Sequence, residues 1–302
     1  MKRIVSVSLG SSKRDHRAEV EFLGEKVVVE RIGTNGDLPK AIQLVRALDG
    51  EVAAFGMGGI DLYLFAGAKR FTIRDAARIA KAARKSPILD GSGLKNTLER
   101  RVVHFLAEEL HLKLKDKTVL MVSAVDRFGM AEAFHEAGCR MIFGDLIFAL
   151  GIPIPIRTLR NLQRLATMVL PVIARLPFKL IYPTGSKQEQ QFPKYGAFFD
   201  EADIIAGDYL YIKKYMPGDL RGKVIVTNTV TQSDIDELRR RGADLLVTST
   251  PEFSGRSYGT NVVEALLVSF SGKRPGELTE ADYLNLLDRL GFQPRVVKFK
   301  EA

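Results

Sequence analysis

The stretch that decides the fold runs from residue 117 to residue 145, KTVLMVSAVDRFGMAEAFHEAGCRMIFGD. Its pattern predicts an apolar strand at Thr118–Ser123, a helix at Met130–Ala137 and a second apolar strand at Cys139–Phe143. Asp145 follows the second strand, where an acidic side chain can bind the hydroxyls of a ribose. This order of elements indicates a parallel β-α-β unit of the kind that binds dinucleotides.

The alternation of apolar strands and helices continues toward the C-terminus. Uninterrupted apolar strands separated by helices are typical of a parallel sheet that helices cover on both faces. Such sheets bind ligands beyond the carboxyl ends of their strands, so the loops after the strands are the places to look for function. We therefore expect an α/β fold, with a Rossmann-like parallel-sheet domain over residues 113–302. The further strands are expected at Lys179–Tyr182, Ile204–Ala206, Val224–Asn228 and Leu245–Thr248.

Residues 1–112 are expected to form a smaller α/β domain, with the loop Ser86–Gly93 between the domains. β-branched and alternating segments predict strands, and apolar residues at helical spacing predict helices. The glycine-rich segment Gly56–Asp61 (GMGGID) follows one of these strands and is explained either by anion binding or by tight packing. The expected strands are Ile4–Leu9, Glu19–Leu23, Lys26–Ile32 and Val52–Phe55, and the expected helices are Asp37–Leu48, Thr72–Lys85 and Leu98–Leu110.

Composition limits the classes of function. The 302 residues carry a formal net charge of +9, but the 45 basic residues are scattered among 36 acidic ones. This distribution is typical of solvated helix faces, so we expect no nucleic-acid partner, and the positive field suits a small anionic substrate. Four histidines and one cysteine predict no zinc or other metal site.

The single cysteine and the apolar segments bear on the compartment. Cys139 cannot form an intramolecular disulfide, fits a reducing compartment and is expected to be a buried thiol. The first apolar run is too short for a signal peptide. The most apolar stretch, residues 141–156, contains Asp145 and two prolines, which favours a core strand and a loop over a membrane span. We expect a cytoplasmic protein without a membrane partner, and homodimer formation is left open.

Upstream of the decisive stretch, the segment Gly93–Glu99 (GLKNTLE) precedes the first strand by one helix. Here the chain resembles the shikimate/quinate 5-dehydrogenase family, in which a G-x-N-T-D segment opens the helix that leads into the cofactor domain. Asn96 and Thr97 match this motif, whereas Leu98 stands at the position of the aspartate. The order of a small domain and a Rossmann-like domain is also similar.

The resemblance implies an NAD(P)-dependent oxidoreductase that acts on a hydroxylated cyclic carboxylate such as quinate or shikimate. It implies a catalytic lysine, for which Lys69 is the candidate by order while Lys85 and Lys95 compete, and it makes His16 a second catalytic candidate. The alternative for each of these lysines is an exposed surface residue without a catalytic role. The implied substrate-binding residues are Ser6, Ser8, Asn96 and Thr97.

Two groups of candidates come from the residues themselves. The loop after the first strand offers hydroxyls and a cation to a carboxylate at Ser11, Ser12 and Lys13, although a polar turn explains it equally well. The turn after Val122 carries Ala124, Asp126 and Gly129 where a G-x-G-x-x-G motif has glycines. The expected NAD- or NADP-binding residues are Ser123, Ala124, Asp126, Arg127, Gly129, Asp145, Thr184 and Arg256.

Two alternatives from other classes of function stay open. One is a non-catalytic sensor whose two domains bind a small anionic metabolite. The other is a transferase or lyase that acts on a phosphorylated or nucleotide-linked substrate and uses the loop 256–261, where Thr260 or Asn261 is expected to cap the helix that follows.

Overall fold

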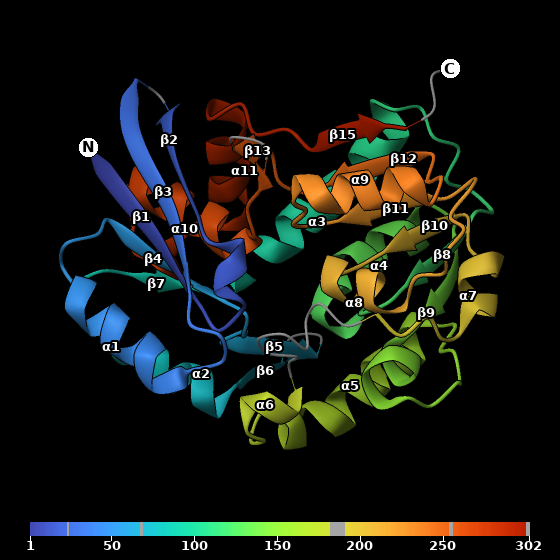
Figure 1. The fold of residues 1–302 in the computed structure, drawn as a ribbon, viewed down its shortest axis with the longest axis horizontal. Coiled ribbons are helices and arrows are strands. Elements are labelled where there is room, and N and C mark those ends of the chain that lie inside the picture. The colour runs from blue at the N-terminus through green and yellow to red at the C-terminus, as the bar shows by residue number, and fades with distance from the viewer. Residues whose placement is uncertain (23, 67–68, 182–190, 254–255, 300–302) are drawn as a thin grey trace. The chain divides into compact units, whose positions relative to one another are not determined.

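The computed structural model describes residues 1–22, 24–66, 69–181, 191–253 and 256–299 (Figure 1). The chain divides into two compact units, and neither of them is continuous in sequence. Unit 1 contains Met1–Lys95, Met168–Glu189 and Gly259–Phe292, and unit 2 contains Asn96–Thr167, Gln190–Tyr258 and Gln293–Ala302. This division differs from the predicted boundary after residue 112. The apolar helix α10 (Thr260–Ser271) packs against the N-terminal sheet, which draws a late segment into unit 1.

Unit 1 is built on a five-stranded sheet with the order β2-β3-β1-β4-β7. The central strand β1 pairs in parallel with β3 and β4, whereas β2 is antiparallel to β3. Ile4 and Val5 of β1 are fully buried, which explains the apolar run at the start of the chain. The strands are β1 (Lys2–Ser8), β2 (His16–Phe22), β3 (Glu25–Gly33), β4 (Ala54–Gly58) and β7 (Ile88–Leu89).

The main further elements of unit 1 lie outside this sheet. They are α1 (Leu38–Leu48), the hairpin of β5 (Tyr63–Ala66) and β6 (Lys69–Thr72), α2 (Arg74–Ala80), α6 (Phe178–Ile181) and α11 (Glu280–Arg289). The glycine-rich segment after β4 serves close packing. A side-chain carbon on Gly56 would lie 2.8 Å from the Asn261 amide nitrogen, and Gly59 has a φ of +72° beside the backbone of Gly10.

Unit 2 contains the six-stranded sheet that the sequence predicts in outline, with the order β15-β12-β11-β10-β8-β9. Its strands are parallel except β15, which pairs antiparallel with β12 at one edge. The strands are β8 (Thr118–Met121), β9 (Arg140–Phe143), β10 (Ile204–Ala206), β11 (Val224–Thr227), β12 (Leu245–Thr248) and β15 (Arg295–Lys298). The parallel-sheet α/β prediction is confirmed.

Helices cover both faces of this sheet, as alternate side chains of β8 show. Val119 and Met121 belong to one apolar cluster, with residues of α3 (Ser92–Glu108) and α4 (Phe128–Glu136). Leu120 and Val122 belong to another. Its helices are α7 (Gly196–Glu201), α8 (Tyr209–Tyr215) and α9 (Gln232–Arg240). The remaining elements are η2 (Val125–Arg127), the π-helical turn η3 (Asp145–Ala149), and the short pair β13 (Glu252–Phe253) and β14 (Arg256–Ser257). Helix α5 (Leu159–Ile173) belongs to unit 2 as far as Thr167 and to unit 1 from Met168 on.

Three local predictions are wrong. Lys179–Ile181 lies in helix α6, not in a strand, because Pro177 starts a turn and the Phe178 N–H donates to the carboxylate of Asp75 at 3.0 Å. The expected loop 86–93 contains the edge strand β7 and the start of α3. Neither Thr260 nor Asn261 caps α10 as expected, because the residue that precedes the helix is Gly259, which has no side chain to form a cap. Among the described residues, no helix has the length and apolar character needed to cross a bilayer.

Candidate functional site

The candidate site lies at the carboxyl edge of the unit 2 sheet, between β8 and β10. The chain leaves β8 for β9 on one side and later returns to β10 on the other side of β8, so the connections diverge there. Ligands of open parallel sheets bind at such a switch point. The loops that begin beyond the two strands meet, because the backbone N–H of Asp208 donates to the hydroxyl of Ser123 at 3.3 Å.

Asp145 holds the backbone of the loop after β8. Its carboxylate accepts hydrogen bonds from the N–H groups of Ala124 at 3.0 Å and of Val125 at 2.9 Å. In a dinucleotide-binding unit, N–H groups of this loop and of the following helix face the diphosphate. Here two of those donors already bind a carboxylate that the chain itself supplies.

A buried ion pair lies beside this loop. Arg127, which is 3% exposed, donates to Glu99 at 2.5 Å and to Asp208 at 3.4 Å. Asp208 also accepts from the side-chain amide of Asn228 at 3.2 Å and from the N–H of Leu210 at 2.9 Å, which caps α8. The guanidinium is therefore directed at carboxylates of the protein, where it offsets the cost of burying Glu99.

The charge of this edge is negative. Burial raises the pKa of Asp145 to about 6, against its two backbone hydrogen bonds, and the charge of Asp126 adds to the rise. Burial, followed by the charges of Asp208, Asp126 and Asp145, raises the pKa of Tyr211 far above its ordinary value. The carboxyl groups of Asp126, Asp145 and Asp208 and the protonated phenol of Tyr211 thus interact electrostatically, beside the Glu99–Arg127 ion pair.

These groups suit a ligand that donates hydrogen bonds. Carboxylates accept from hydroxyl and ammonium groups, while the Tyr211 hydroxyl can donate one bond. Asp208 keeps 27% of its side chain exposed, which leaves acceptor sites open to solvent. A phosphate would meet like charges here. In the parts of the chain that the structure describes, no group of three or more His, Cys, Asp or Glu side chains is placed to hold a metal ion.

The predicted cofactor-binding residues fall into two sets. Ser123, Ala124, Asp126, Arg127 and Asp145 come together at this edge as described above. Gly129 lies nearby in α4 and packs against Asn96 of α3, so that a side-chain carbon at residue 129 would overlap the Asn96 amide. Thr184 lies outside the described residues, and of Arg256 only the backbone position in β14 is described.

The predicted substrate-binding residues of unit 1 gather at the end of β1 and bind one another or the backbone nearby. Ser8 accepts from Arg31 at 2.9 Å, and Ser6 accepts from the Asn261 amide at 3.0 Å. The Ser11 hydroxyl accepts from the Lys13 N–H at 3.3 Å. Further along the same loop, Ser12 exchanges two hydrogen bonds with Asn35, at 2.8 and 3.0 Å, while the Lys13 side chain is exposed. These contacts fit the structural turn that the sequence also allowed.

The remaining candidates are more dispersed. His16 is half-buried in β2, opposite Arg31 of β3, and Lys69 is exposed at the start of β6. Of the two unit 2 candidates in α3, Asn96 is exposed at its place against Gly129, and Thr97 is buried. Lys69 in β6 and His16 in β2 lie on other strands than Ser6 and Ser8, which belong to β1.

The expected buried thiol is confirmed. Cys139 is 7% exposed and its sulfur donates to the carbonyl of Leu114 at 3.2 Å. Burial raises the pKa of this thiol to about 11, which keeps it protonated and unreactive near neutral pH.

Unit 1 contains a second polar centre that the sequence did not indicate. Glu264 in α10 is buried and accepts from the N–H of Gly91 at 2.8 Å and from the hydroxyl of Tyr283 at 2.9 Å. Burial, helped by the charge of Asp90, raises its pKa to about 7. This carboxyl group links α10 and α11 to the start of α3, which is a structural role.

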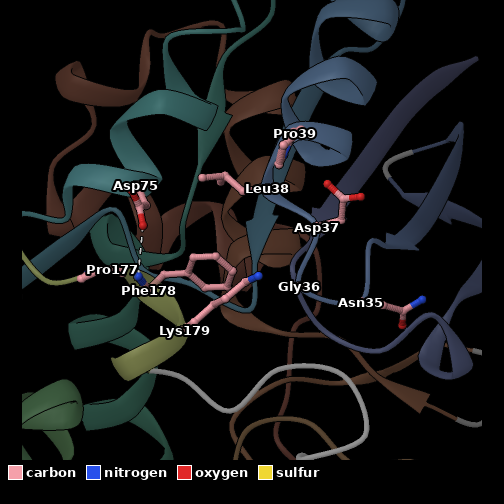
Figure 2. Close-up of a pocket in the computed structure, with 9 residues that line it drawn as sticks. All are labelled: Asn35, Gly36, Asp37, Leu38, Pro39, Asp75, Pro177, Phe178 and Lys179. Atoms are coloured by element: carbon pink, nitrogen blue, oxygen red, sulfur yellow. Dashed lines mark hydrogen bonds between the residues drawn. The ribbon is translucent and has the colours of Figure 1, made fainter.

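A hollow of about 470 Å³ opens on unit 1 at the start of α1 (Figure 2). Its polar lining includes Asn35, Asp37, Asp75 and Lys179. Asp37 already caps α1 through the Lys40 N–H, and Asp75 holds the backbone of Phe178. The hollow therefore offers fewer uncommitted polar groups than the edge of the unit 2 sheet.

The sequence did not single out Glu99, Asp208, Tyr211 or Asn228 as functional residues. Asp208 and Asn228 could have been found, because each follows a correctly predicted parallel strand at its carboxyl end. Glu99 gave no such signal, since its place opposite Arg127 depends on the packing of α3.

The fold defines a two-unit α/β protein whose candidate ligand site lies at a parallel-sheet edge. The chain belongs to the family described as Domain of unknown function (DUF8754), which matches residues 93–299. Residues 3–90 match a second family, Domain of unknown function (DUF8753). No curated protein matches the sequence.

Several solved structures align with most of the chain at low identity. A galactofuranose binding protein is 13% identical, with a TM-score of 0.38, and the alignment covers 96% of this chain and 99% of that one. The NAD-dependent malic enzyme from Thermotoga maritima is 12% identical, with a TM-score of 0.33 and coverage of 97% and 85%. L-tryptophan dehydrogenase from Nostoc punctiforme is 12% identical, with a TM-score of 0.36 and coverage of 96% and 80%.

Proposed function

We propose that this protein binds a small hydroxylated ligand that carries no phosphate, at the carboxyl edge of the unit 2 sheet. The observation that carries the proposal is the contact of Asp145 with the N–H groups of Ala124 and Val125. Donors that would bind a diphosphate are directed at a carboxylate, and Asp126 and Asp208 add negative charge around them.

The chemistry of the lining narrows the class of ligand. A sugar or cyclic polyol presents neighbouring hydroxyl groups, and each can donate to a carboxylate oxygen. An amino group on such a ligand would gain a charge-assisted bond as well. An uncharged or cationic polyol therefore fits this edge better than a nucleotide does, and the preference follows from the sign of the charge.

The second candidate is an NAD(P)-dependent oxidoreductase of the quinate or shikimate type. The order of β8, α4 and β9, with Asp145 two residues after the end of β9, favours it, because this is where a ribose hydroxyl is bound in dinucleotide-binding units. In this case a ribose would compete with the loop for Asp145, and the diphosphate would lie beside Asp126. Lys69 and His16 would remain the candidates for handling the proton of the reacting hydroxyl.

Thermal unfolding of the whole chain with a panel of compounds tests both candidates. The panel contains uncharged sugars and cyclitols, amino sugars, quinate, shikimate, NAD and NADP. A ligand at 100 times its Kd stabilises the folded state by about 2.7 kcal/mol, which is a shift in Tm of about 5–10 °C for a domain of this size. The proposal predicts such a shift with a sugar, cyclitol or amino sugar and none with NAD or NADP.

Matched variants test whether the ligand binds at this edge. Asp208→Asn keeps the shape and the helix-capping ability of the side chain but removes its charge, so the shift should fall. Asp236→Asn on the exposed side of α9 is the control and should leave the shift unchanged. A shift with NAD or NADP, together with absorbance of the reduced nicotinamide when quinate or shikimate is added, would establish the oxidoreductase instead.

A further inference from the structure

One long segment of the chain has basic residues and no acidic ones. Between Asp145 and Glu189 there is no Asp or Glu, in a protein with 36 acidic residues overall. Six basic residues lie in the same interval, so the segment carries positive charge that no neighbour in the sequence offsets. They are Arg157, Arg160, Arg164, Arg175, Lys179 and Lys187.

The same segment exposes apolar side chains. Of eleven exposed large apolar side chains among the described residues, seven lie between residues 150 and 180. Four of them belong to unit 1 and follow one another at intervals of four residues: Met168, Val172, Leu176 and Leu180, which are 69%, 61%, 37% and 74% exposed. Large apolar side chains concentrated in this way mark a contact surface, whereas single ones do not.

Helix α5 and the turn after it explain this arrangement. Leu162, Ala166 and Leu170 are buried at intervals of four residues on one side of α5. Its exposed side begins with Arg160 and Arg164 and continues with apolar residues. Pro171 and Pro177 interrupt the helical hydrogen bonding, and the short helix α6 continues the segment.

Further basic side chains of unit 1 adjoin this segment. The N–H of Arg74 donates to the carbonyl of Ala174 at 3.0 Å, which brings the start of α2 to the end of α5. Arg74 and Arg78 are largely exposed on either side of the buried Asp75. Asp37 lines the same hollow as Lys179 and Asp75 (Figure 2). Among these described groups, four are basic (Arg74, Arg78, Arg175 and Lys179) and two are acidic (Asp37 and Asp75).

We propose that the segment from Met168 to Leu180 binds the surface of an anionic lipid bilayer. The four apolar side chains would enter the boundary between headgroups and acyl chains, while Arg175 and Lys179 bind phosphate or carboxylate headgroups. The protein lies on the bilayer and does not cross it, in agreement with the absence of a spanning helix among the described residues. A second copy of this chain fits the surface less well, since a symmetric contact would bring positive charges together.

Flotation with lipid vesicles tests this inference on the full chain. One set of vesicles is pure phosphatidylcholine. The other contains about 30% phosphatidylserine, which gives it the negative surface of an anionic leaflet. We expect binding to the anionic vesicles, weaker binding at high salt, and little binding to the neutral ones. The double variant Arg175→Glu/Lys179→Glu should bind at least about tenfold more weakly, because each basic residue near an anionic surface contributes about fivefold.

The apolar contribution needs its own variants. Val172→Glu/Leu180→Glu should also lose binding, while the control Leu284→Glu, at a partly exposed position of α11, should bind as the wild type does. Circular dichroism and the thermal transition of each variant show that it is folded. Three results would overturn the proposal: no preference for anionic vesicles, binding unaffected by the apolar variant, or a dimer in sedimentation velocity that Val172→Glu/Leu180→Glu dissociates.

Discussion

Replacing Arg127 by methionine tests the buried centre of the candidate site. The Arg127 and Glu99 side chains are only 3% and 1% exposed, and their charged groups are 2.5 Å apart. Removing one partner of a buried pair typically costs about 3–5 kcal/mol, because the remaining charge stays out of water. For a unit of this size the Tm should fall by about 6–20 °C.

The control and the double variant separate this cost from a general loss of packing. Arg127→Met/Glu99→Leu removes both charges at similar volume and should recover most of the lost stability. Arg239→Met breaks an exposed pair with Asp236, whose side chains are more than half exposed, and should cost less than about 1 kcal/mol. Urea unfolding followed by circular dichroism measures all three. If Arg127→Met costs as little as Arg239→Met, the pair is not buried in solution and the site is built differently.

Three further predictions concern other groups. Because burial raises the pKa of Asp145 to about 6, the contribution of this one group to the stability falls as the pH rises from 4 to 6. In urea titrations, Asp145→Asn should abolish this fall, and its free energy of unfolding should exceed that of the wild type by at most about 3 kcal/mol. Gly93→Ala places a carbon against Glu264 and should cost about 1–3 kcal/mol in thermal unfolding, whereas Gly276→Ala, in open space, should be nearly neutral. A thiol reagent should modify Cys139 only as fast as the protein unfolds, since the thiol is buried with a pKa of about 11.

Much of the fold could be predicted because the strands of unit 2 are buried on both faces. Val119–Met121 and Ile204–Ala206 are fully or almost fully buried, and such strands appear in the sequence as plain apolar runs. The short edge strand Ile88–Leu89 has no such run. The composition of the units could not be predicted either, since the packing of α10 on the N-terminal sheet is a contact between distant segments.

The sequence indicated some of the residues that the structure brings together at the candidate site. Position after a strand indicated Ser123, Asp126 and Asp145, because a parallel sheet brings the carboxyl ends of its strands together. What each carboxylate binds is decided by distances that no motif contains. Because the N–H groups of Ala124 and Val125 donate to Asp145, we interpret this loop as part of an acidic edge and not as an anion site.

The most direct measurement is calorimetric titration of the wild type and of Asp208→Asn, first with NAD and then with the polyol that gives the largest thermal shift. We predict heat of binding with the polyol, affinity lost in the variant, and no binding of NAD. Saturable binding of NAD to the wild type, unchanged in Asp208→Asn, would contradict an acidic edge that binds hydroxyl groups.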